Sequence, residues 1–209
     1  MSPTAAPRRL AVLVSGSGTN LQALLDAIAA EDSFGGEVVV VASDRPDAAG
    51  LRRAADVGIA TEAVPFERGS DRAAWERTLT DRVAAHDPEV IVLAGFMRIL
   101  SGAFLSRWPD RVVNTHPSLL PAFRGAHAVD DALAYGVKVT GSTVHLVDEE
   151  VDHGPIVAQR AVEVHADDTV DILHGRIKAV EHELLPACVR LLCHDRLVVE
   201  GRHVHVRPR

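Results

Sequence analysis

The chain has 209 residues, 47% of them hydrophobic, and a formal net charge of −7, which allows a sizeable core and argues against nucleic acid as a partner. Residues 1–9 contain no apolar segment of signal-peptide length, and no run in the chain approaches the 18 apolar residues of a membrane span. The two cysteines, Cys188 and Cys193, form neither a disulfide framework nor a metal-ligand pattern, so we expect a cytoplasmic protein without a bound metal.

The first half of the chain alternates short apolar runs with helical patterns. Strands are expected at residues 10–14, 37–42, 59–64, 90–94 and 112–115, and helices at 20–30, 48–57, 71–86 and 101–107. The strand segments are apolar throughout, which is typical of parallel strands that are covered on both faces. This order predicts an α/β fold with a mostly parallel, twisted sheet flanked by helices.

The pattern changes after the fifth expected strand. A helix is expected at residues 128–135, two strands at 140–147 and 156–164, a long helix at 169–192 that is interrupted near Pro186, and a small hairpin at 197–206. The short connection between the two strands indicates an antiparallel C-terminal part. Because the composition shows no linker, we expect a single domain over residues 1–209, and its first half, residues 8–115, is of the mononucleotide-binding type.

A glycine-rich loop joins the first expected strand to the first helix. Residues 15–20 read Ser-Gly-Ser-Gly-Thr-Asn, so the backbone can approach a ligand closely beside the unpaired N–H groups of a helix N-terminus. The loop predicts a site for a monophosphate, because neither the Walker pattern nor a Mg²⁺-holding pattern accompanies it. The alternative is an ordinary tight turn in which Thr19 or Asn20 caps the helix.

The segment 111–125 carries the clearest chemical signal. Asn114 and His116 lie two residues apart at the end of an expected strand, so their side chains point to the same side. An amide donor beside the side chain that titrates near neutral pH can hold an oxyanion and manage a proton. These are the two requirements of acyl transfer.

An acidic loop at residues 148–155 joins the two antiparallel strands. For most loops of this composition a solvated charged turn is the better interpretation. Asp152 differs because it precedes a Gly-Pro break, where the backbone can follow an unusual path. A carboxylate held near His116 could orient the imidazole, raise its pKa, or take a proton through a water.

Four segments together resemble the folate-dependent phosphoribosylglycinamide formyltransferases, in the order of that family and over nearly the whole chain. They are residues 15–22, 93–100, 114–121 and 151–155. The resemblance implies a formyltransferase-type Rossmann-like fold. It also implies a direct, metal-free transfer of the formyl group from the co-substrate 10-formyltetrahydrofolate to the amine of 5-phosphoribosylglycinamide (GAR), yielding formyl-GAR and tetrahydrofolate in de novo purine biosynthesis.

The resemblance also assigns roles to individual residues. Asn114, His116 and Asp152 fall on the family's catalytic positions. Asn114 and a protonated His116 would stabilise the oxyanion that develops on the formyl oxygen. Asp152 would keep His116 charged and help to move the proton from the attacking nitrogen, through a water.

Two further sets of residues match the binding positions of the family. The resemblance also implies that residues 116–209 form the folate-binding and catalytic half. The ribonucleotide set is Gly18, Thr19, Asn20, Lys178 and Glu181. The folate set is Arg72, Met97, Arg98, Ile99, Leu100, Asp148 and Val151. Lys178 and Glu181 share one face of a helix, and without the resemblance an exposed ion pair would be the better interpretation.

Two positions depart from the family pattern. Thr115 stands where Ile is common and is expected to point away from its catalytic neighbours. His153 replaces a frequent Gly in the acidic loop, where it could alter the mobility of the loop or add a second titrating group near Asp152.

The main alternative is formyltetrahydrofolate deformylase, a hydrolase with the same three catalytic residues. That family carries an additional N-terminal domain, for which residues 1–9 leave no room. Methionyl-tRNA formyltransferase needs a C-terminal tRNA-binding domain, and a silent nucleotide- or folate-binding module would not need Asn114, His116 and Asp152 together. The expected ligands are small molecules, and the sequence is compatible with a homodimer without determining the oligomeric state.

Overall fold

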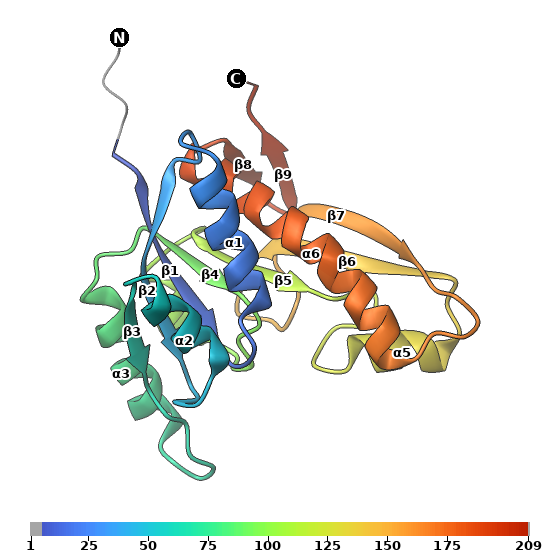
Figure 1. Ribbon diagram of the computed structural model, residues 1–209, viewed down its shortest axis with the longest axis horizontal. Coiled ribbons are helices and arrows are strands. Elements are labelled where there is room, and N and C mark those ends of the chain that lie inside the picture. The colour runs from blue at the N-terminus through green and yellow to red at the C-terminus, as the bar shows by residue number, and fades with distance from the viewer. Residues whose placement is uncertain (1–5, 209) are drawn as a thin grey trace.

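A seven-stranded sheet with the order β3-β2-β1-β4-β5-β6-β7 forms the centre of the computed structural model, which describes residues 6–208 (Figure 1). The strands are β1 (Arg8–Val14), β2 (Gly36–Ser43), β3 (Ala60–Ala63), β4 (Val90–Leu93), β5 (Val112–His116), β6 (Val139–Leu146) and β7 (Ile156–Glu163). Residues 1–5, part of the segment expected to lack a signal peptide, and residue 209 lie outside the described residues.

The strand directions confirm the expected α/β architecture. Strands β1 to β5 are mutually parallel, whereas β6 pairs antiparallel with both β5 and β7. A separate antiparallel hairpin is formed by β8 (Leu197–Glu200) and β9 (His203–Val206). The inner parallel strands β1, β4 and β5 are almost fully buried because helices cover both faces of the sheet, whereas the edge strand β3 is exposed or half-buried.

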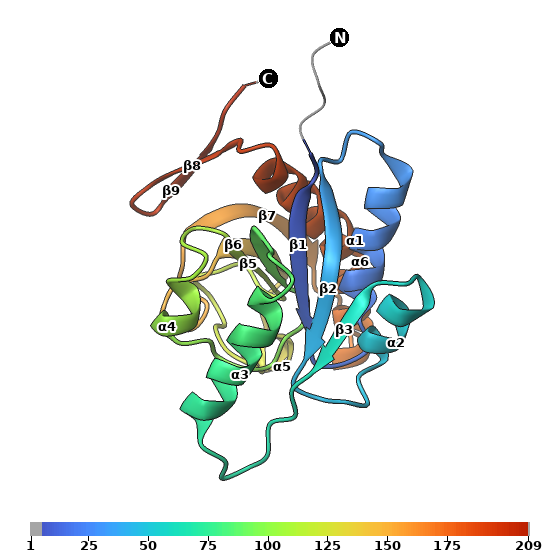
Figure 2. The same ribbon diagram turned by 90° about the vertical axis from the view of Figure 1, so that its left-hand side faces the viewer.

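The helices divide between the two faces of the sheet (Figure 2). They are α1 (Thr19–Ala30), α2 (Ala49–Asp56), α3 (Arg72–Ala84), α4 (Gly102–Leu105), α5 (Ala128–Tyr135) and α6 (Val170–Cys193). Alternate residues of β1 point to opposite faces, so Leu10 and Val12 pack with α1, α2 and α6, whereas Ala11 and Leu13 pack with α3 and α4. This alternation decides on which side of the sheet each later site residue lies.

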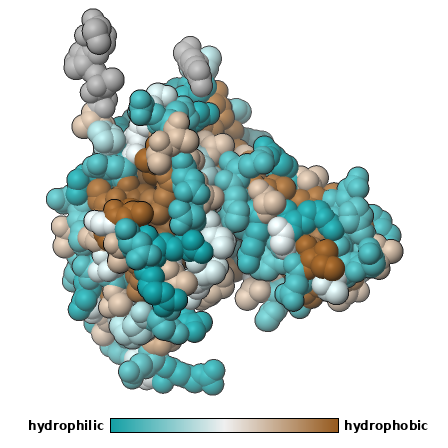
Figure 3. Space-filling model, viewed as in Figure 1, coloured by the Kyte–Doolittle hydropathy of each residue, from teal (hydrophilic) through white to brown (hydrophobic). Residues whose placement is uncertain are grey.

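The order of the strands reverses at β1, which lies between β2 and β4. In open α/β sheets, ligands bind outside the carboxyl ends of the strands at such a point. The loops that follow β1 and β4 therefore border the expected crevice. Figure 3 shows a hollow between the part of the molecule that carries α1 and α2 and the lobe that carries α5.

The last long helix differs from expectation. An interruption was expected near Pro186, but α6 continues through this residue for 24 residues in total. A proline inside a helix lacks an N–H and costs about 3 kcal/mol. Leu184, Leu185 and Val189 are buried in the core on both sides of the proline and hold the helix together. Within residues 6–208, no helix combines the length and the apolar character needed to cross a membrane.

Candidate active site

A cavity of about 300 Å³ lies at the carboxyl ends of β4 and β5. Three segments that are distant in sequence line most of it: residues 95–100 after β4, residues 114–117 at the end of β5, and residues 145–152 after β6. His174 of α6 closes part of the wall. Asn114, His116 and Asp152 all line this cavity, so the convergence expected from the sequence occurs.

Asn114 has a partner that the sequence did not reveal. The antiparallel register places Asn114 of β5 directly opposite His145 of β6, and the Asn114 amide Nδ2 lies 3.2 Å from His145 Nε2. His145 Nδ1 lies 2.9 Å from the Leu146 carbonyl, which requires an Nδ1–H donor and leaves Nε2 as an acceptor. Asn114 therefore donates one amide N–H to His145 and keeps the second for a ligand in the cavity.

The imidazole of His116 is buried and held from two sides. His116 Nε2 lies 2.8 Å from the Phe123 carbonyl, and His116 Nδ1 lies 3.3 Å from Asp152 Oδ2. Burial lowers the pKa of His116 below its ordinary value and outweighs Asp152, which acts in the opposite direction. Asp152 thus acts on His116 in the expected direction, and burial opposes it in the free site.

Asp152 is placed by an unusual backbone. Its φ angle is +48°, a conformation that non-glycine residues rarely adopt. The following glycine has no room for a side chain, because a Cβ on Gly154 would lie 1.9 Å from the Leu146 carbonyl oxygen. The close packing of Gly154 on the end of β6 thus holds Asp152 at the cavity.

The carboxylate of Asp152 collects several donors. The Gly125 N–H donates to Asp152 Oδ2 at 2.8 Å, and His145 Nε2 lies 3.7 Å from Asp152 Oδ1. Burial by itself would raise the pKa of Asp152, but the nearby rings of His145 and His116 and the Gly125 hydrogen bond hold that pKa below its ordinary value. Asp152 is therefore ionised at neutral pH and can accept a proton only when a strong acid is formed beside it.

The loop after β1 leads into a helix whose N-terminus has no side-chain cap within residues 6–208. Helix α1 begins at Thr19 with Gly18 as its N-cap, and no side chain within the described residues caps its first turn. The alternative in which Thr19 or Asn20 is the cap is therefore wrong. Gly18 is required on two grounds, since its φ is +69° and a Cβ would lie 2.6 Å from the Gly50 Cα. The unpaired N–H groups remain available for an anion.

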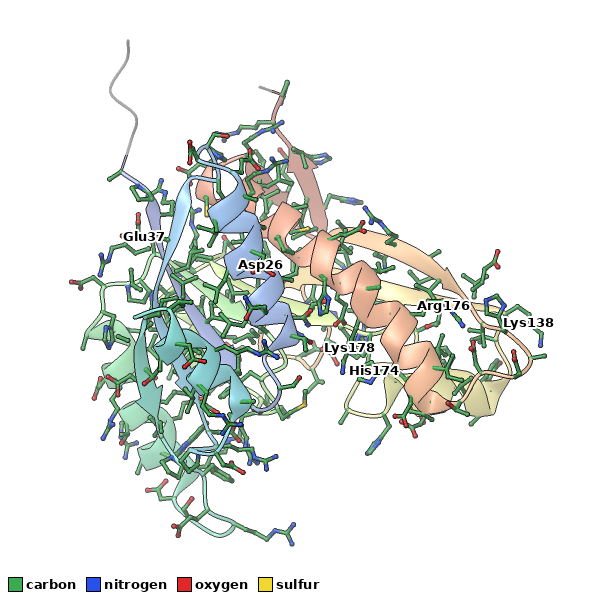
Figure 4. The ribbon with its side chains drawn as sticks, viewed as in Figure 1. Asp26, Glu37, Lys138, His174, Arg176 and Lys178 are labelled. Atoms are coloured by element: carbon green, nitrogen blue, oxygen red, sulfur yellow. The ribbon has the colours of Figure 1, made fainter. Side chains whose placement is uncertain are left out.

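Glu181 is buried at the other side of this loop. Only 4% of Glu181 is exposed, and the Asn20 amide Nδ2 donates to its carboxylate at 2.9 Å. This burial excludes the exposed ion pair considered as an alternative for Lys178 and Glu181. Figure 4 shows Lys178 one turn beyond His174 on α6. A further cation, Arg53 of α2, donates to the Ser17 carbonyl at 2.9 Å.

The segment after β4 is tied to the ends of β1 and β2. The Met97 N–H donates to Ser15 Oγ at 2.9 Å, and Ser15 Oγ donates to Asp44 Oδ1 at 2.5 Å. Arg98 Nε donates to the other oxygen of Asp44 at 2.7 Å, while the guanidinium stacks 4.5 Å above the Phe66 ring. Arg98 thus keeps its two NH₂ groups for a ligand, although Nε is committed.

The exposed apolar residues of the folate set gather at the cavity. Met97, Ile99 and Val151 are 68%, 56% and 44% exposed and line its rim, whereas Leu100 is buried beneath them. Arg72 of α3 donates to the Ile99 carbonyl and so fixes the outer part of this segment. Apolar surface that is exposed around a concave site suits a flat, partly aromatic ligand.

His153 contacts the acidic loop and the C-terminal hairpin. His153 Nδ1 lies 2.7 Å from Asp148 Oδ2, and Arg202 of the β8–β9 hairpin contacts both His153 Nε2, at 3.0 Å, and the His153 carbonyl, at 2.7 Å. His153 thus connects the acidic loop to the C-terminal hairpin, and its role as a second titrating group near Asp152 stays a prediction.

Three residues of the site were missed at the level of sequence. The sequence analysis assigned no role to His145, Asp44 or Arg53. A β5–β6 register that places residue 145 opposite residue 114 would have revealed His145, but the turn lengths do not determine that register. Within residues 6–208, no group of three or more His, Cys, Asp or Glu side chains is arranged to hold a metal ion.

Comparison with known proteins places this geometry in a family. Residues 8–189 match the family model described as formyl transferase. The chain is 48% identical over 200 residues to a phosphoribosylglycinamide formyltransferase from Mycobacterium tuberculosis, a match that covers 96% of this chain and 92% of that protein. It is 43% identical over 196 residues to the trifunctional purine biosynthetic protein adenosine-3 of Bos taurus, covering 93% of this chain and 19% of that protein.

Solved structures show the same likeness. A glycinamide ribonucleotide transformylase 1 from Symbiobacterium toebii superposes with a TM-score of 0.92 at 46% identity, covering 97% of this chain and 95% of that one. A formyltetrahydrofolate deformylase from Pseudomonas syringae gives a TM-score of 0.90 at 29% identity, covering 98% of this chain and 67% of that one. The architecture is common to both activities, and the sequence is closer to the transferase.

Proposed function

The chain belongs to the formyl transferase family, among the phosphoribosylglycinamide formyltransferases of purine biosynthesis, and we propose that its formyl donor is 10-formyltetrahydrofolate and its acceptor the amine of GAR. One observation carries this proposal. The three polar residues of β5 and the acidic loop meet in a cavity whose rim is the apolar segment after β4. The open N-terminus of α1, at the end of the neighbouring strand β1, supplies a place for the phosphate.

In the proposed reaction, the amine nitrogen of GAR forms a bond to the formyl carbon, and the bond between that carbon and N10 of the folate breaks. Negative charge develops on the formyl oxygen, where the free N–H of Asn114 donates a hydrogen bond. Loss of one such donor typically costs about 3–4 kcal/mol of barrier. Asn114 is placed for this role by its bond to His145.

His116 and Asp152 manage the proton. Burial lowers the pKa of His116 in the free site, whereas both the developing oxyanion and the carboxylate of Asp152 favour its protonated form. The amine of GAR becomes a strong acid when it has attacked, so its one proton passes, through a water, to the pair of Asp152 and His116 and finally reaches N10 of the leaving folate. Transient protonation of His116 stabilises the charged intermediate.

Two groups of residues are proposed to bind the two substrates. Gly18, Thr19 and Asn20 hold the phosphate together with Lys178, and Glu181 accepts hydrogen bonds from the ribose or glycinamide part. The folate ring lies between residues 97–100 and the wall formed by Asp148 and Val151, and Arg72 and Arg98 face its glutamate tail. Within one domain, the ribonucleotide site and the folate site thus both draw on residues 8–115 and on residues 116–209.

A cytoplasmic setting and small-molecule ligands complete the proposal. Cys188 and Cys193 are free and buried, and burial raises the pKa of each thiol to about 12, so neither is a reactive thiolate. The net charge of −7 opposes binding to nucleic acid.

The competing activity is hydrolysis of the folate, because the deformylase from Pseudomonas syringae shares the architecture. The decisive experiment incubates the purified protein with 10-formyltetrahydrofolate, with and without GAR, and follows the absorbance of the folate. We expect turnover only when GAR is present. Equal turnover with the donor alone would establish the hydrolase and reject the transferase.

A further inference from the structure

The acidic loop is closed by the side chain of its first residue. Asp148 Oδ1 accepts the Glu150 N–H at 3.1 Å, and Asp148 Oδ2 lies 2.7 Å from His153 Nδ1. The two oxygens of one carboxylate thus connect the start of the loop to its end. Asp148, Glu150 and Val151 line the cavity between these two ends. The shape of this wall therefore depends on what holds His153 in place.

The partners of His153 determine which ring nitrogen carries the hydrogen. A carboxylate can only accept a hydrogen bond, so His153 Nδ1 carries a hydrogen and donates it to Asp148. A guanidinium can only donate, so Arg202 Nη1 donates to the lone pair of His153 Nε2 at 3.0 Å. Arg202 Nη2 also donates to the His153 carbonyl at 2.7 Å. One guanidinium therefore holds both the ring and the backbone of His153.

Arg202 belongs to an element that is anchored independently of the loop. It lies with Gly201, whose φ is +61°, in the two-residue turn between β8 and β9. Leu197 and Val199 of β8 pack against the hydrophobic core, and β9 lies beside β7 (Figure 1). No residue of the loop 148–153 is buried, so the loop depends on hydrogen bonds for its conformation. The hairpin is thus the fixed partner and the loop the part that is held.

We propose that Arg202 is a positioning residue of the folate site, because it holds the wall formed by Asp148 and Val151 through His153. The inference rests on the proposed function and gives that function a use for the C-terminal hairpin. Arg202 acts from outside the cavity and touches no reacting atom. Asp152 is secured separately by the close packing of Gly154, so loss of Arg202 affects binding of the formyl donor more than the chemical step.

The side chain at position 153 decides whether this connection can form. A glycine there, as the family resemblance led us to expect, would offer neither a donor to Asp148 nor an acceptor to Arg202. Glutamine carries one amide donor group and one carbonyl acceptor, as the neutral imidazole carries one donor and one acceptor. His153→Gln is therefore the conservative replacement, and His153→Ala removes the connection.

The test compares Arg202→Met with Arg207→Met, which removes the same charge from the same C-terminal segment. Arg207 is exposed, and its guanidinium makes no hydrogen bond or ion pair within residues 6–208. We expect Arg202→Met to raise KM for 10-formyltetrahydrofolate about fivefold, the size of an exposed charged contact. In the same variant, KM for GAR and kcat should stay within about twofold, and Arg207→Met should leave all three constants unchanged.

A double variant distinguishes one connection from two separate effects. His153→Ala should raise the donor KM as much as Arg202→Met, and the double variant should raise it no further. His153→Gln should recover part of the loss. Multiplicative increases in the donor KM would show that the two residues act independently and would overturn the inference.

A measurement without substrate separates this inference from the proposed function. Amide hydrogen exchange of residues 148–153 should be at least about fivefold faster in Arg202→Met, including the Glu150 N–H that Asp148 accepts, and unchanged in Arg207→Met. Unchanged exchange in Arg202→Met, or equal donor KM values in the two arginine variants, would overturn the inference even in an active transferase. Turnover of the donor without GAR would reject the proposed acceptor and retain the role of Arg202 if the donor KM still rises in Arg202→Met.

Discussion

At the scale of residues, the site is governed by two histidines that share one carboxylate. His116 lies 3.3 Å from one oxygen of Asp152, and His145 lies 3.7 Å from the other. Two protonated rings at these distances would repel each other, and a charge on His145 lowers the pKa of His116. His145 Nε2 accepts the hydrogen bond of Asn114, so we assign the proton of the proposed reaction to His116 and Asp152.

The first prediction concerns Asp152→Asn. The variant should bind both substrates and lose about 100- to 10,000-fold in kcat, because the proton acceptor is removed while the shape of the site is kept. The pKa of His116 should fall further below its ordinary value, since Asp152 is the group that raises it. Steady-state kinetics measure the first effect, and NMR titration of the His116 ring measures the second. Turnover close to wild type would remove Asp152 from the mechanism.

The second prediction concerns His145→Phe, which keeps the ring volume and removes the acceptor for Asn114. We expect kcat to fall about 10- to 100-fold, as misplacement of a catalytic group does elsewhere, and His145→Gln to recover part of the loss. If His145 acts through Asn114, the double variant His145→Phe/Asn114→Ala should be no slower than Asn114→Ala alone. Multiplicative losses in kcat would show that the two residues act independently.

At the scale of elements, the decisive unit is the hairpin of β6 and β7 with its acidic loop. The register of β6 against β5 aligns His145 with Asn114, and the loop returns Asp152 to the same strand end. The loop is secured at two points, by the packing of Gly154 on Leu146 and by the bonds between His153 and Arg202. The first contact is buried and the second exposed, so the first contributes more to the position of Asp152.

The third prediction therefore concerns Gly154→Ala. A methyl group 1.9 Å from the Leu146 carbonyl cannot be accommodated, and because its neighbour is backbone the loop must move. We expect kcat to fall at least about 100-fold while the circular dichroism spectrum of the α/β core remains.

Gly175→Ala provides the control for this change. Residue 175 lies in α6 with open space around the new methyl group, so the protein should gain up to about 1 kcal/mol of stability and keep its activity. Normal kcat in Gly154→Ala would show that the acidic loop tolerates displacement.

At the scale of the whole molecule, both substrate sites are joined by one buried carboxylate. Asp44, at the end of β2, accepts hydrogen bonds from Ser15 after β1 and from Arg98 after β4. Its side chain is 1% exposed, whereas that of Arg98 is 32% exposed. The loop proposed to bind the phosphate and the segment proposed to bind the folate are thus held to one another across three parallel strands.

The fourth prediction follows from this difference in exposure. Arg98→Met should destabilise the protein by about 3 kcal/mol, because it leaves a buried carboxylate without its cation. Asp44→Asn should cost less, since the freed guanidinium can reach water. The double variant should then be more stable than Arg98→Met alone, as measured by urea unfolding. A double variant less stable than Arg98→Met would show that the two groups do not form a pair.

Much of the fold could be predicted from local patterns. Continuous apolar strands between helical segments predicted the parallel sheet, and the two runs at 140–147 and 156–164 predicted the antiparallel part, because burial on both faces and short connections leave a direct imprint on sequence. The predicted interruption of the helix at Pro186 was wrong, because the core contacts of Leu184, Leu185 and Val189 outweigh the low helix propensity of proline.

The sequence by itself determined which chemistry this protein can perform: Asn114 and His116 share one side of a strand through the period of two, and the loop 15–20 marks an anion site through its glycines. Only the tertiary structure decided how these groups are tuned. The pairing of β5 with β6, which depends on register, brought His145 to Asn114, and burial lowered the pKa of His116 against the pull of Asp152. Register and desolvation arise from contacts between segments distant in the chain, so no local pattern encodes them.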